Sequence, residues 1–232
     1  MPRQGAVLII PALNEAPVIA TTLRRIPAGM FRMVIVADNG STDGTGEIAR
    51  RAGAVVARIE ERGYGGACLA AIAIVPEDAA VAVFMQADGS EDPQEAEKLL
   101  TPIYDGRADL VLGSRVLGRA SQGALLPHQR FGNWLATTLV RWLYGHAYSD
   151  LGPFRAIRME ALRGLGMRDR NYGWTIEMQV RVLRRGLRVM EVPVEYGVRA
   201  AGENKVSGNL RASLRAGVKI LSVIARLAIS AR

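Results

Sequence analysis

The stretch "VFMQADGSEDP" (residues 83–93) joins an apolar run, a polar loop and a helix start. Its first three residues are continuously apolar, as strands buried on both faces of a parallel sheet are. Asp92 followed by Pro93 is typical of a helix N-cap with proline at the first helical position. The stretch therefore predicts a strand–loop–helix unit whose polar side chains gather at the carboxyl end of the strand.

The same alternation extends through the first half of the chain. Apolar runs predict strands at 6–10, 33–37, 54–57, 80–85 and 109–113. Helical patterns lie between them, around 16–25, 43–52, 66–74 and 93–104. Strands alternating with helices are typical of an α/β fold. We therefore expect a mostly parallel central sheet flanked by helices.

The second half is less regular. Residues 128–145 predict a helix with an aromatic face, and 173–186 a helix that ends at a glycine. Residues 187–196 alternate like a strand, and Pro193 indicates an edge position. No repeat or linker divides the chain, so we expect one domain over 1–209 and a separate helix over 210–232.

Composition limits the partners. The 232 residues carry a net charge of +8, which favours an anionic partner such as a phosphate or an acidic lipid. The lone Cys68 excludes an internal disulfide and suits a reducing, cytoplasmic setting. No apolar stretch approaches the ~20 residues that a membrane-spanning helix needs. A nucleic-acid partner is not expected, because no basic and aromatic readout motif is present.

Polar loops follow the predicted strands. In open α/β sheets, ligands bind outside the carboxyl ends of the strands, so these loops are expected to form a site. The loops are "PALNEA" (11–16), "DNGSTDGT" (38–45), "QADGSEDP" (86–93) and "GSR" (113–115). Turn formation alone would also explain each loop taken singly.

The usual nucleotide motifs are absent. No G-x-G-x-x-G follows the first strand, and no Walker P-loop occurs anywhere in the sequence. "GYGGA" (63–67) opens a helix, so its amides could face a phosphate, although a tight turn explains it equally well.

A family resemblance emerges from the order of the motifs. These are "IPALNE", "VADNGSTDGT", "GYGGACLAA", "ADGSEDP", "LGSR", "DLGPFRAIR", "YGWTIEMQV", "VPVEY" and "KVSG". Together they resemble family 2 inverting glycosyltransferases with the Rossmann-like GT-A fold, and most of all the dolichyl- and polyprenyl-phosphate sugar transferase branch. The resemblance runs from residue 6 to about 210. It implies a nucleotide-sugar half over 1–117 and an acceptor half over 118–209.

The resemblance also implies a donor site. Pro11, Asn14 and Glu15 would line the nucleoside pocket, and Asp38 would accept a hydrogen bond from the base. Asp38 could instead cap its own loop. Arg199 and Lys205 would clasp the diphosphate or an acceptor phosphate as a late loop closes.

The family's Asp-x-Asp turn is altered in this chain. The positions that would hold Mg²⁺ or Mn²⁺ are Gln86, Asp88 and Ser90, so one carboxylate is missing. Mg²⁺ needs only one or two carboxylates when substrate phosphates are present. We expect a weak, donor-dependent metal site, with Glu91 as a nearby reserve carboxylate. The alternative is a non-catalytic nucleotide-sugar-binding protein.

The acceptor decides which groups are needed. A lipid phosphate is already anionic and needs cations to position it, and the resemblance gives this role to Arg115 and Arg130. A hydroxyl acceptor needs a base, and Asp150 is the candidate. Asp150 could also be structural and pair with Arg155. Trp174 and Glu177 would shape the acceptor side or belong to the core.

The segment 210–232 carries an apolar stripe flanked by basic residues. The stripe is Leu210, Leu214, Val218, Leu221, Ile224 and Ala228. Such a helix can lie on an anionic membrane or pack on its own domain. Because a lipid acceptor must be reached at a membrane, we expect peripheral contact with the inner membrane face. The nucleotide, the sugar and any homo-oligomer remain undetermined by the sequence.

Overall fold

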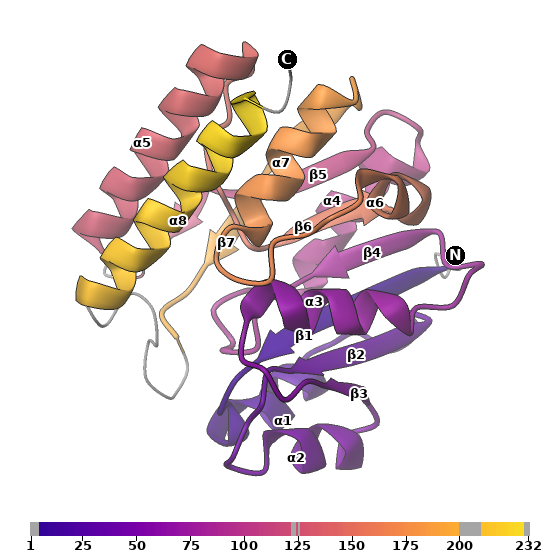
Figure 1. Ribbon diagram of the computed structural model, residues 1–232. Helices are drawn as coiled ribbons and strands as arrows, with labels where there is room; N and C mark the ends of the chain where they lie inside the picture. Colours follow the sequence, from indigo (N-terminus) through magenta and orange to yellow (C-terminus); the bar gives the residue numbers. More distant parts are fainter. Residues whose placement is uncertain (1–4, 122–123, 125, 200–209, 230–232) are drawn as a thin grey trace.

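The computed structural model describes residues 5–121, 124, 126–199 and 210–229, and it shows an α/β fold (Figure 1). Seven strands form one sheet in this described part, in the order β3-β2-β1-β4-β6-β5-β7. The strands are β1 (Ala6–Ala12), β2 (Met33–Asp38), β3 (Val55–Arg58), β4 (Val81–Phe84), β5 (Leu110–Ala120), β6 (Arg155–Arg158) and β7 (Val189–Tyr196). β6 runs antiparallel to both its neighbours, and every other pair is parallel.

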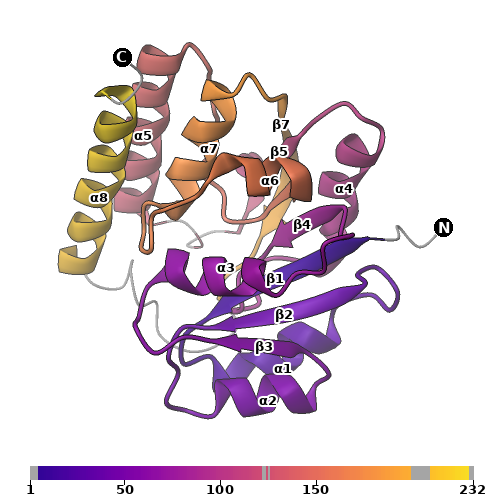
Figure 2. The same cartoon turned by 45° about the vertical axis from the view of Figure 1, so that its right-hand side comes forward.

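Helices cover both faces of the sheet. They are α1 (Ala16–Arg24), α2 (Thr45–Arg51), α3 (Tyr64–Ala73), α4 (Ala96–Tyr104), α5 (Pro127–Tyr144), α6 (Met159–Leu165), α7 (Trp174–Arg184) and α8 (Leu210–Ile229), with a short 3₁₀ turn, η1 (Pro93–Glu95), before α4. Figure 2 shows α3 on one face of β1–β3, and α1 and α2 on the other.

Two hydrophobic cores lie on the two faces. One joins Ile9 and Ile35 to α3, α7 and α8, and the other joins Leu8 and Val36 to α1, α2 and α4. The strands therefore bury side chains on both faces, which is why their sequences are almost continuously apolar. The predicted α/β class and mostly parallel sheet are confirmed.

The second half contains two elements that the sequence analysis did not predict. β6 is only four residues long and carries an arginine at each end, so it lacks the apolar run that marked the other strands. Met159–Leu165 then forms α6 directly after it. Pro193 lies on β7, which is an edge strand of the sheet as predicted.

Helix α8 packs on its own domain. It lies beside α5 in both ribbon views, and Tyr144 on α5 donates a hydrogen bond to the Ile224 carbonyl (Figures 1 and 2). Val223, Ile224 and Leu227 are at least 96% buried. Ile224, which the sequence analysis placed on the apolar stripe, is thus a core residue, whereas Val218 on the same stripe is 67% exposed. No helix in the described part is long and apolar enough to cross a membrane.

Candidate active site

The loops that follow β1, β2 and β4 meet the ends of β5 and β7 around a cavity of about 590 Å³. We call it the donor cavity. Most of the predicted donor and metal residues line it, namely Pro11, Asn14, Glu15, Gln86, Asp88 and Arg199, and so does Arg115, which was predicted to contact the acceptor phosphate. They come together because parallel strands end at the same edge of the sheet.

The first two loops are tied to each other. Asn14 has a positive φ of 50°; its N–H donates to Ser41 Oγ, and its Oδ1 accepts from Thr42 N–H. Asp43 accepts hydrogen bonds from the N–H groups of Ala16 and Thr45, the first residues of α1 and α2. These contacts fix the floor of the donor cavity and place the Asp43 carboxylate at the start of both helices.

Asp38 lies beside the donor cavity but does not line it. It is fully buried at the end of β2, accepts from Ser41 N–H at 2.8 Å, and forms an ion pair with Arg58 at 3.1 Å. The adjacent Asn39 lines the cavity instead. The sequence left two roles open for Asp38, binding the base and capping its own loop. The structure shows contacts for the loop-capping role.

The altered Asp-x-Asp turn is a compact group of oxygen atoms. Ser90 donates to Asp88 Oδ1 through its N–H (3.0 Å) and its hydroxyl (2.5 Å). Ser90 Oγ also lies 3.3 Å from Gln86 Oε1, which accepts from Tyr196 OH at 3.4 Å. The three predicted metal positions are thus neighbours in space. No cluster of three or more His, Cys, Asp or Glu side chains that could hold a metal occurs among the described residues.

Arg199 bridges the two acidic side chains of the donor cavity. Its Nη2 donates to Glu15 Oε1, and its Nη1 lies 3.3 Å from Asp88 Oδ2. Glu15 and Asp88 come from the ends of β1 and β4, so one guanidinium links two loops. Arg199 is therefore brought to the predicted donor site, whereas Lys205 lies outside the described residues.

Glu91 lies beneath the turn rather than in it. Its side chain is 2% exposed, and Oε2 accepts from Gln86 N–H at 2.7 Å. Burial raises the pKa of the Glu91 carboxyl to about 8, with Asp88 nearby adding to the increase. Glu91 does not line the donor cavity, and its carboxyl group is bonded to the backbone of the turn, so it supports the turn instead of serving as a reserve carboxylate.

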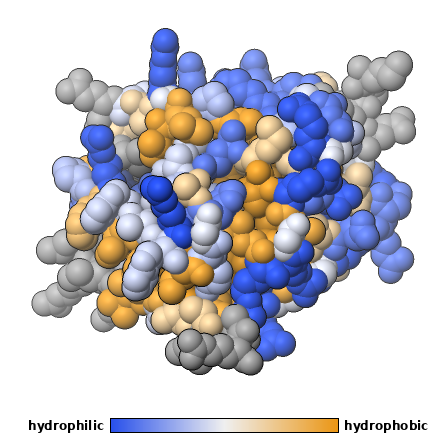
Figure 3. Space-filling model, turned by 90° about the horizontal axis from the view of Figure 1, so that it is seen from above, coloured by the Kyte–Doolittle hydropathy of each residue, from blue (hydrophilic) through white to orange (hydrophobic). Residues whose placement is uncertain are grey.

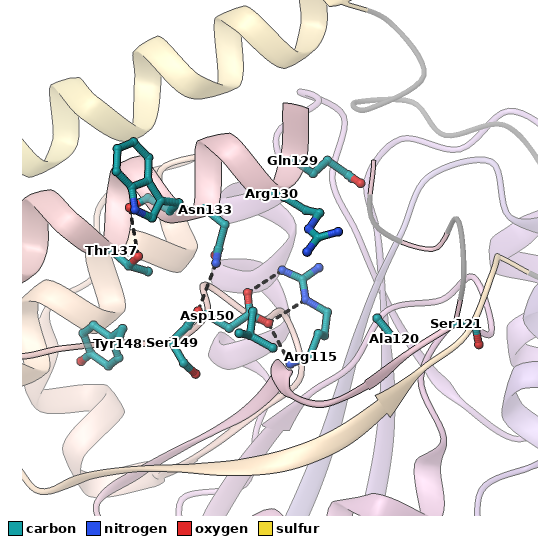
Figure 4. A pocket seen from close by; sticks show the side chains of 12 residues that line it. Arg115, Ala120, Ser121, Gln129, Arg130, Asn133, Thr137, Tyr148, Ser149 and Asp150 are labelled. Atoms are coloured by element: carbon teal, nitrogen blue, oxygen red, sulfur yellow. Dashed lines mark hydrogen bonds and ion pairs between the residues drawn. The ribbon is translucent and has the colours of Figure 1, made fainter. Parts of the chain in front are cut away.

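A second cavity of about 640 Å³, the acceptor cavity, adjoins the donor cavity between β5 and α5. Arg115 and Gln129 line both cavities. Arg115 Nε and Nη2 each donate at 2.8 Å to an oxygen of Asp150, and Arg115 N–H donates to the same carboxylate at 2.9 Å (Figure 4). Arg115 also stacks over the Tyr196 ring at 5.1 Å. The guanidinium is therefore fixed between the cavities.

The turn carrying Asp150 is held from three elements. Asn133 on α5 bonds the backbone of Ser149 and Leu151, and Gln179 on α7 donates to the Asp150 carbonyl. Glu191 on β7 accepts from the N–H groups of Ser149 and Asp150. Sequence analysis missed Asn133, Gln179 and Glu191. No local signal distinguishes these three, because α5, α7 and β7 carry other polar residues as well, such as Arg130, Glu177 and Glu195.

The remaining predicted acceptor residues separate into two groups. Arg130 lines the acceptor cavity and, in Figure 4, points into it from α5. Trp174 and Glu177 are core residues: Trp174 is 1% exposed and packs edge-on against Phe84, and Glu177 is fully buried and bonded to Arg181. Of their two predicted roles, the structure supports the core role.

The glycine-rich start of α3 serves close packing. A Cβ on Gly65 would lie 2.0 Å from the Asp169 carbonyl oxygen, and Gly66 N–H donates to the Arg170 carbonyl. Only glycine permits the 169–170 loop to approach this closely. The amide of Gly66 is thus used inside the protein rather than offered to a phosphate.

Comparisons with known proteins agree with this geometry. An uncharacterized glycosyltransferase of Mycobacterium tuberculosis is 36% identical over 225 residues, covering 97% of this chain and all of the relative. The undecaprenyl-phosphate mannosyltransferase of Micrococcus luteus is 32% identical and covers 87% of each chain. The fold matches glucosyl-3-phosphoglycerate synthase from M. tuberculosis, solved with Mn²⁺, UDP and glucosyl-3-phosphoglycerate. Its TM-score is 0.79 at 22% identity, over 97% of this chain and 80% of the other.

The family model "Glycosyl transferase family 2" matches residues 7–166, which include β1 to α6 and most of the donor cavity. The matched residues of this chain include the altered Asp-x-Asp turn and the Arg115–Asp150 pair, and the match to the 36% identical relative spans 97% of the chain. The chain therefore belongs to glycosyltransferase family 2 and has the GT-A fold.

Proposed function

We propose that this enzyme moves a sugar from a nucleotide-diphosphate donor to a polyprenyl phosphate at a membrane surface. The observation that carries the proposal is Arg115, a fixed guanidinium that lines both the donor and the acceptor cavity. A cation held at that point can attract an anionic acceptor toward the departing diphosphate. The mannosyltransferase relative from Micrococcus luteus, named for undecaprenyl phosphate, agrees with this acceptor class.

The state of Asp150 favours an anionic acceptor. Both of its carboxylate oxygens accept from Arg115, and its side chain is 1% exposed. A general base must reach the proton that it removes, and these oxygens are directed at the guanidinium. An acceptor phosphate carries no proton that needs removal. We therefore assign Asp150 the task of positioning Arg115, and Arg130 the task of attracting the acceptor from the other wall.

The donor turn suits a divalent ion that is held mainly by the donor. Asp88 offers one carboxylate, and Gln86 and Ser90 offer neutral oxygens beside it. Oxygen ligands with only one or two carboxylates are typical of Mg²⁺ sites that share substrate phosphates. When bound, the ion would neutralise charge on the leaving diphosphate. Asp88, Gln86 and Ser90 would hold it, and Glu15 and Asn14 would shape the nucleoside side.

The surface of α5 supports a membrane location. Phe131, Trp134 and Trp142 are 61%, 59% and 83% exposed, on the side of the helix opposite its buried residues. Phe131 and Trp134 contact each other with ring centroids 5.8 Å apart. Trp134 also lines the acceptor cavity, and Arg130 and Arg141 flank the stripe. Aromatic side chains beside arginines are typical of helices that lie in an anionic membrane interface.

Figure 3 shows hydrophobic residues gathered over the left and centre of the upper face, where α5, α8 and α7 lie in Figure 1. Hydrophilic residues dominate the right-hand side. We therefore place the membrane contact mainly on α5, with α8 packed beside it. Deletion of residues 210–232 would remove core side chains, so it would change the folding of the protein as well as its membrane binding.

The test is transfer of radiolabelled sugar from a panel of UDP- and GDP-sugars, with Mg²⁺ or Mn²⁺. Undecaprenyl phosphate is compared with a hydroxyl acceptor, the dephosphorylated undecaprenol. Glycolipid formed from the phosphate alone, and lost in Arg115→Gln, supports the proposal. The surface variant Arg51→Gln is the control. Transfer to the alcohol would favour the hydroxyl reaction, and donor binding without transfer to either would favour a non-catalytic protein.

A further inference from the structure

The Arg199 guanidinium lies beside Asp88, at the position that a divalent ion bound to Asp88 would occupy. Its Nη1 lies 3.3 Å from Asp88 Oδ2, while Ser90 occupies Asp88 Oδ1 from the other side. Both Asp88 oxygens are therefore engaged in the structure. The side chains of Arg199 and Asp88 are 19% and 11% exposed, so their attraction is only partly screened by water.

The same guanidinium also neutralises Glu15. The two acids lie on loops that follow different strands, and Arg199 connects them by Nη2 to Glu15 Oε1 and Nη1 to Asp88 Oδ2. A guanidinium presents several N–H donors in a rigid fork, which suits it to bridge two carboxylates. Without a cation at this position, two partly buried carboxylates would face one cavity, which is electrostatically costly.

Gln86 reduces the number of carboxylates at the turn. The neutral amide contributes an oxygen but no charge, so Arg199 meets two carboxylates in this cavity, Glu15 and Asp88, rather than three. A divalent ion would need Asp88 Oδ2 and would repel a guanidinium held at the same oxygen. Arg199 and a divalent ion therefore cannot both bind Asp88 Oδ2 at the same time.

We propose that Arg199 is a displaceable internal cation that competes with the divalent ion for Asp88. In the empty site Arg199 holds Asp88 and Glu15 together. The donor diphosphate brings negative charge that attracts the guanidinium away from Asp88 and frees this carboxylate for the metal. The inference rests on the proposed function, since it requires a metal and a donor diphosphate at this site. Its consequence is that metal binds weakly alone and strongly with the donor.

The experiment measures Mn²⁺ affinity directly, from the electron paramagnetic resonance signal of free Mn²⁺, without nucleotide, with UDP and with GDP; UDP below stands for whichever of the two tightens Mn²⁺ binding. Arg199→Gln is compared with the native chain and with Arg62→Gln. Arg62 lines the same cavity but forms no hydrogen bond or ion pair with Asp88, so its variant removes an equal charge from the cavity. Asp88→Asn establishes that the Mn²⁺ measured is at this turn. Thermal unfolding of each variant verifies that it is folded.

Competition predicts that Arg199→Gln tightens Mn²⁺ binding without UDP by about tenfold, while Arg62→Gln changes it less than about twofold. The extra tightening of Mn²⁺ by UDP should shrink in Arg199→Gln, because UDP no longer has a cation to displace. Equal Mn²⁺ affinity in the native chain and Arg199→Gln, with UDP still tightening Mn²⁺, would overturn the competition and leave the proposed function standing. Absence of Mn²⁺ binding in every protein, with UDP and equally with GDP, would overturn both.

Discussion

Arg115 and Asp150 form a bidentate ion pair, with two N···O distances of 2.8 Å, at the boundary between the two cavities. The pair is nearly closed to solvent, with side-chain exposures of 14% and 1%. A buried pair adds little net stability compared with apolar side chains, but losing one partner strands the other charge. The pair is thus better understood as a means of aiming a guanidinium than as a stabilising contact.

Replacing Asp150 should therefore damage acceptor use more than donor binding. We expect Asp150→Asn to raise the KM for polyprenyl phosphate about tenfold or more, because one N–H···O bond and the charge attraction are lost. The Kd of the nucleotide-sugar should change less than about twofold. Steady-state kinetics and calorimetry measure the two quantities. A fall in kcat with an unchanged acceptor KM would instead indicate a base.

Two variants at position 86 differ from each other in charge but not in side-chain size. Gln86→Asp adds a carboxylate beside Asp88, whereas Gln86→Asn shortens the side chain equally and stays neutral. We expect Gln86→Asp to tighten Mn²⁺ binding without donor by about tenfold relative to Gln86→Asn, because Mg²⁺-type ions favour carboxylates. Calorimetric titration compares the two. If both variants bind Mn²⁺ equally, the metal is not held at this turn.

Much of the fold could be predicted because parallel strands buried on both faces must be apolar. That rule found β1 to β5 and their loops, and it brought Asn14, Gln86 and Asp88 to one edge. It could not find β6, whose arginines at 155 and 158 break the apolar run. β6 is held in the sheet by pairing with β4 on one side and β5 on the other. Such pairing is a tertiary effect that the local sequence pattern does not reveal.

The site residues divide in the same way. Positions on strand-end loops could be predicted, because the sheet itself sets where they meet. Glu191 could not, since its partners Ser149 and Asp150 lie 41–42 residues away in the chain and the contact depends on how β7 lies beside β5. The Arg199 bridge likewise joins residues 111 and 184 positions apart. Such contacts follow from packing, which spacing does not fix.

Glu91 should make stability depend on pH. Its pKa is raised to about 8 in the folded protein, from 4.5 for an ordinary glutamate. Between these values the unfolded chain ionises Glu91 while the folded chain keeps the proton, so stability falls as pH rises through this window. We expect Glu91→Gln, relative to the native chain, to gain about 2 to 4 kcal/mol of unfolding free energy between pH 5 and pH 8. Urea unfolding at both pH values measures it, and a pH-independent difference would contradict the buried neutral acid.

The aromatic stripe of α5 should control membrane binding. Phe131 and Trp142 are exposed and lie outside both cavities, so Phe131→Ser with Trp142→Ser should leave the fold intact. Because each aromatic ring removes a large apolar area from water when it enters the interface, we expect affinity for anionic phosphatidylglycerol vesicles to fall at least about tenfold. Ile74→Ser, which removes another exposed apolar side chain after α3, is the matched control. Vesicle cosedimentation compares the proteins at equal salt. An equal loss in the Ile74 variant would indicate general surface hydrophobicity, and an unchanged affinity in the double variant would exclude α5 as the membrane contact.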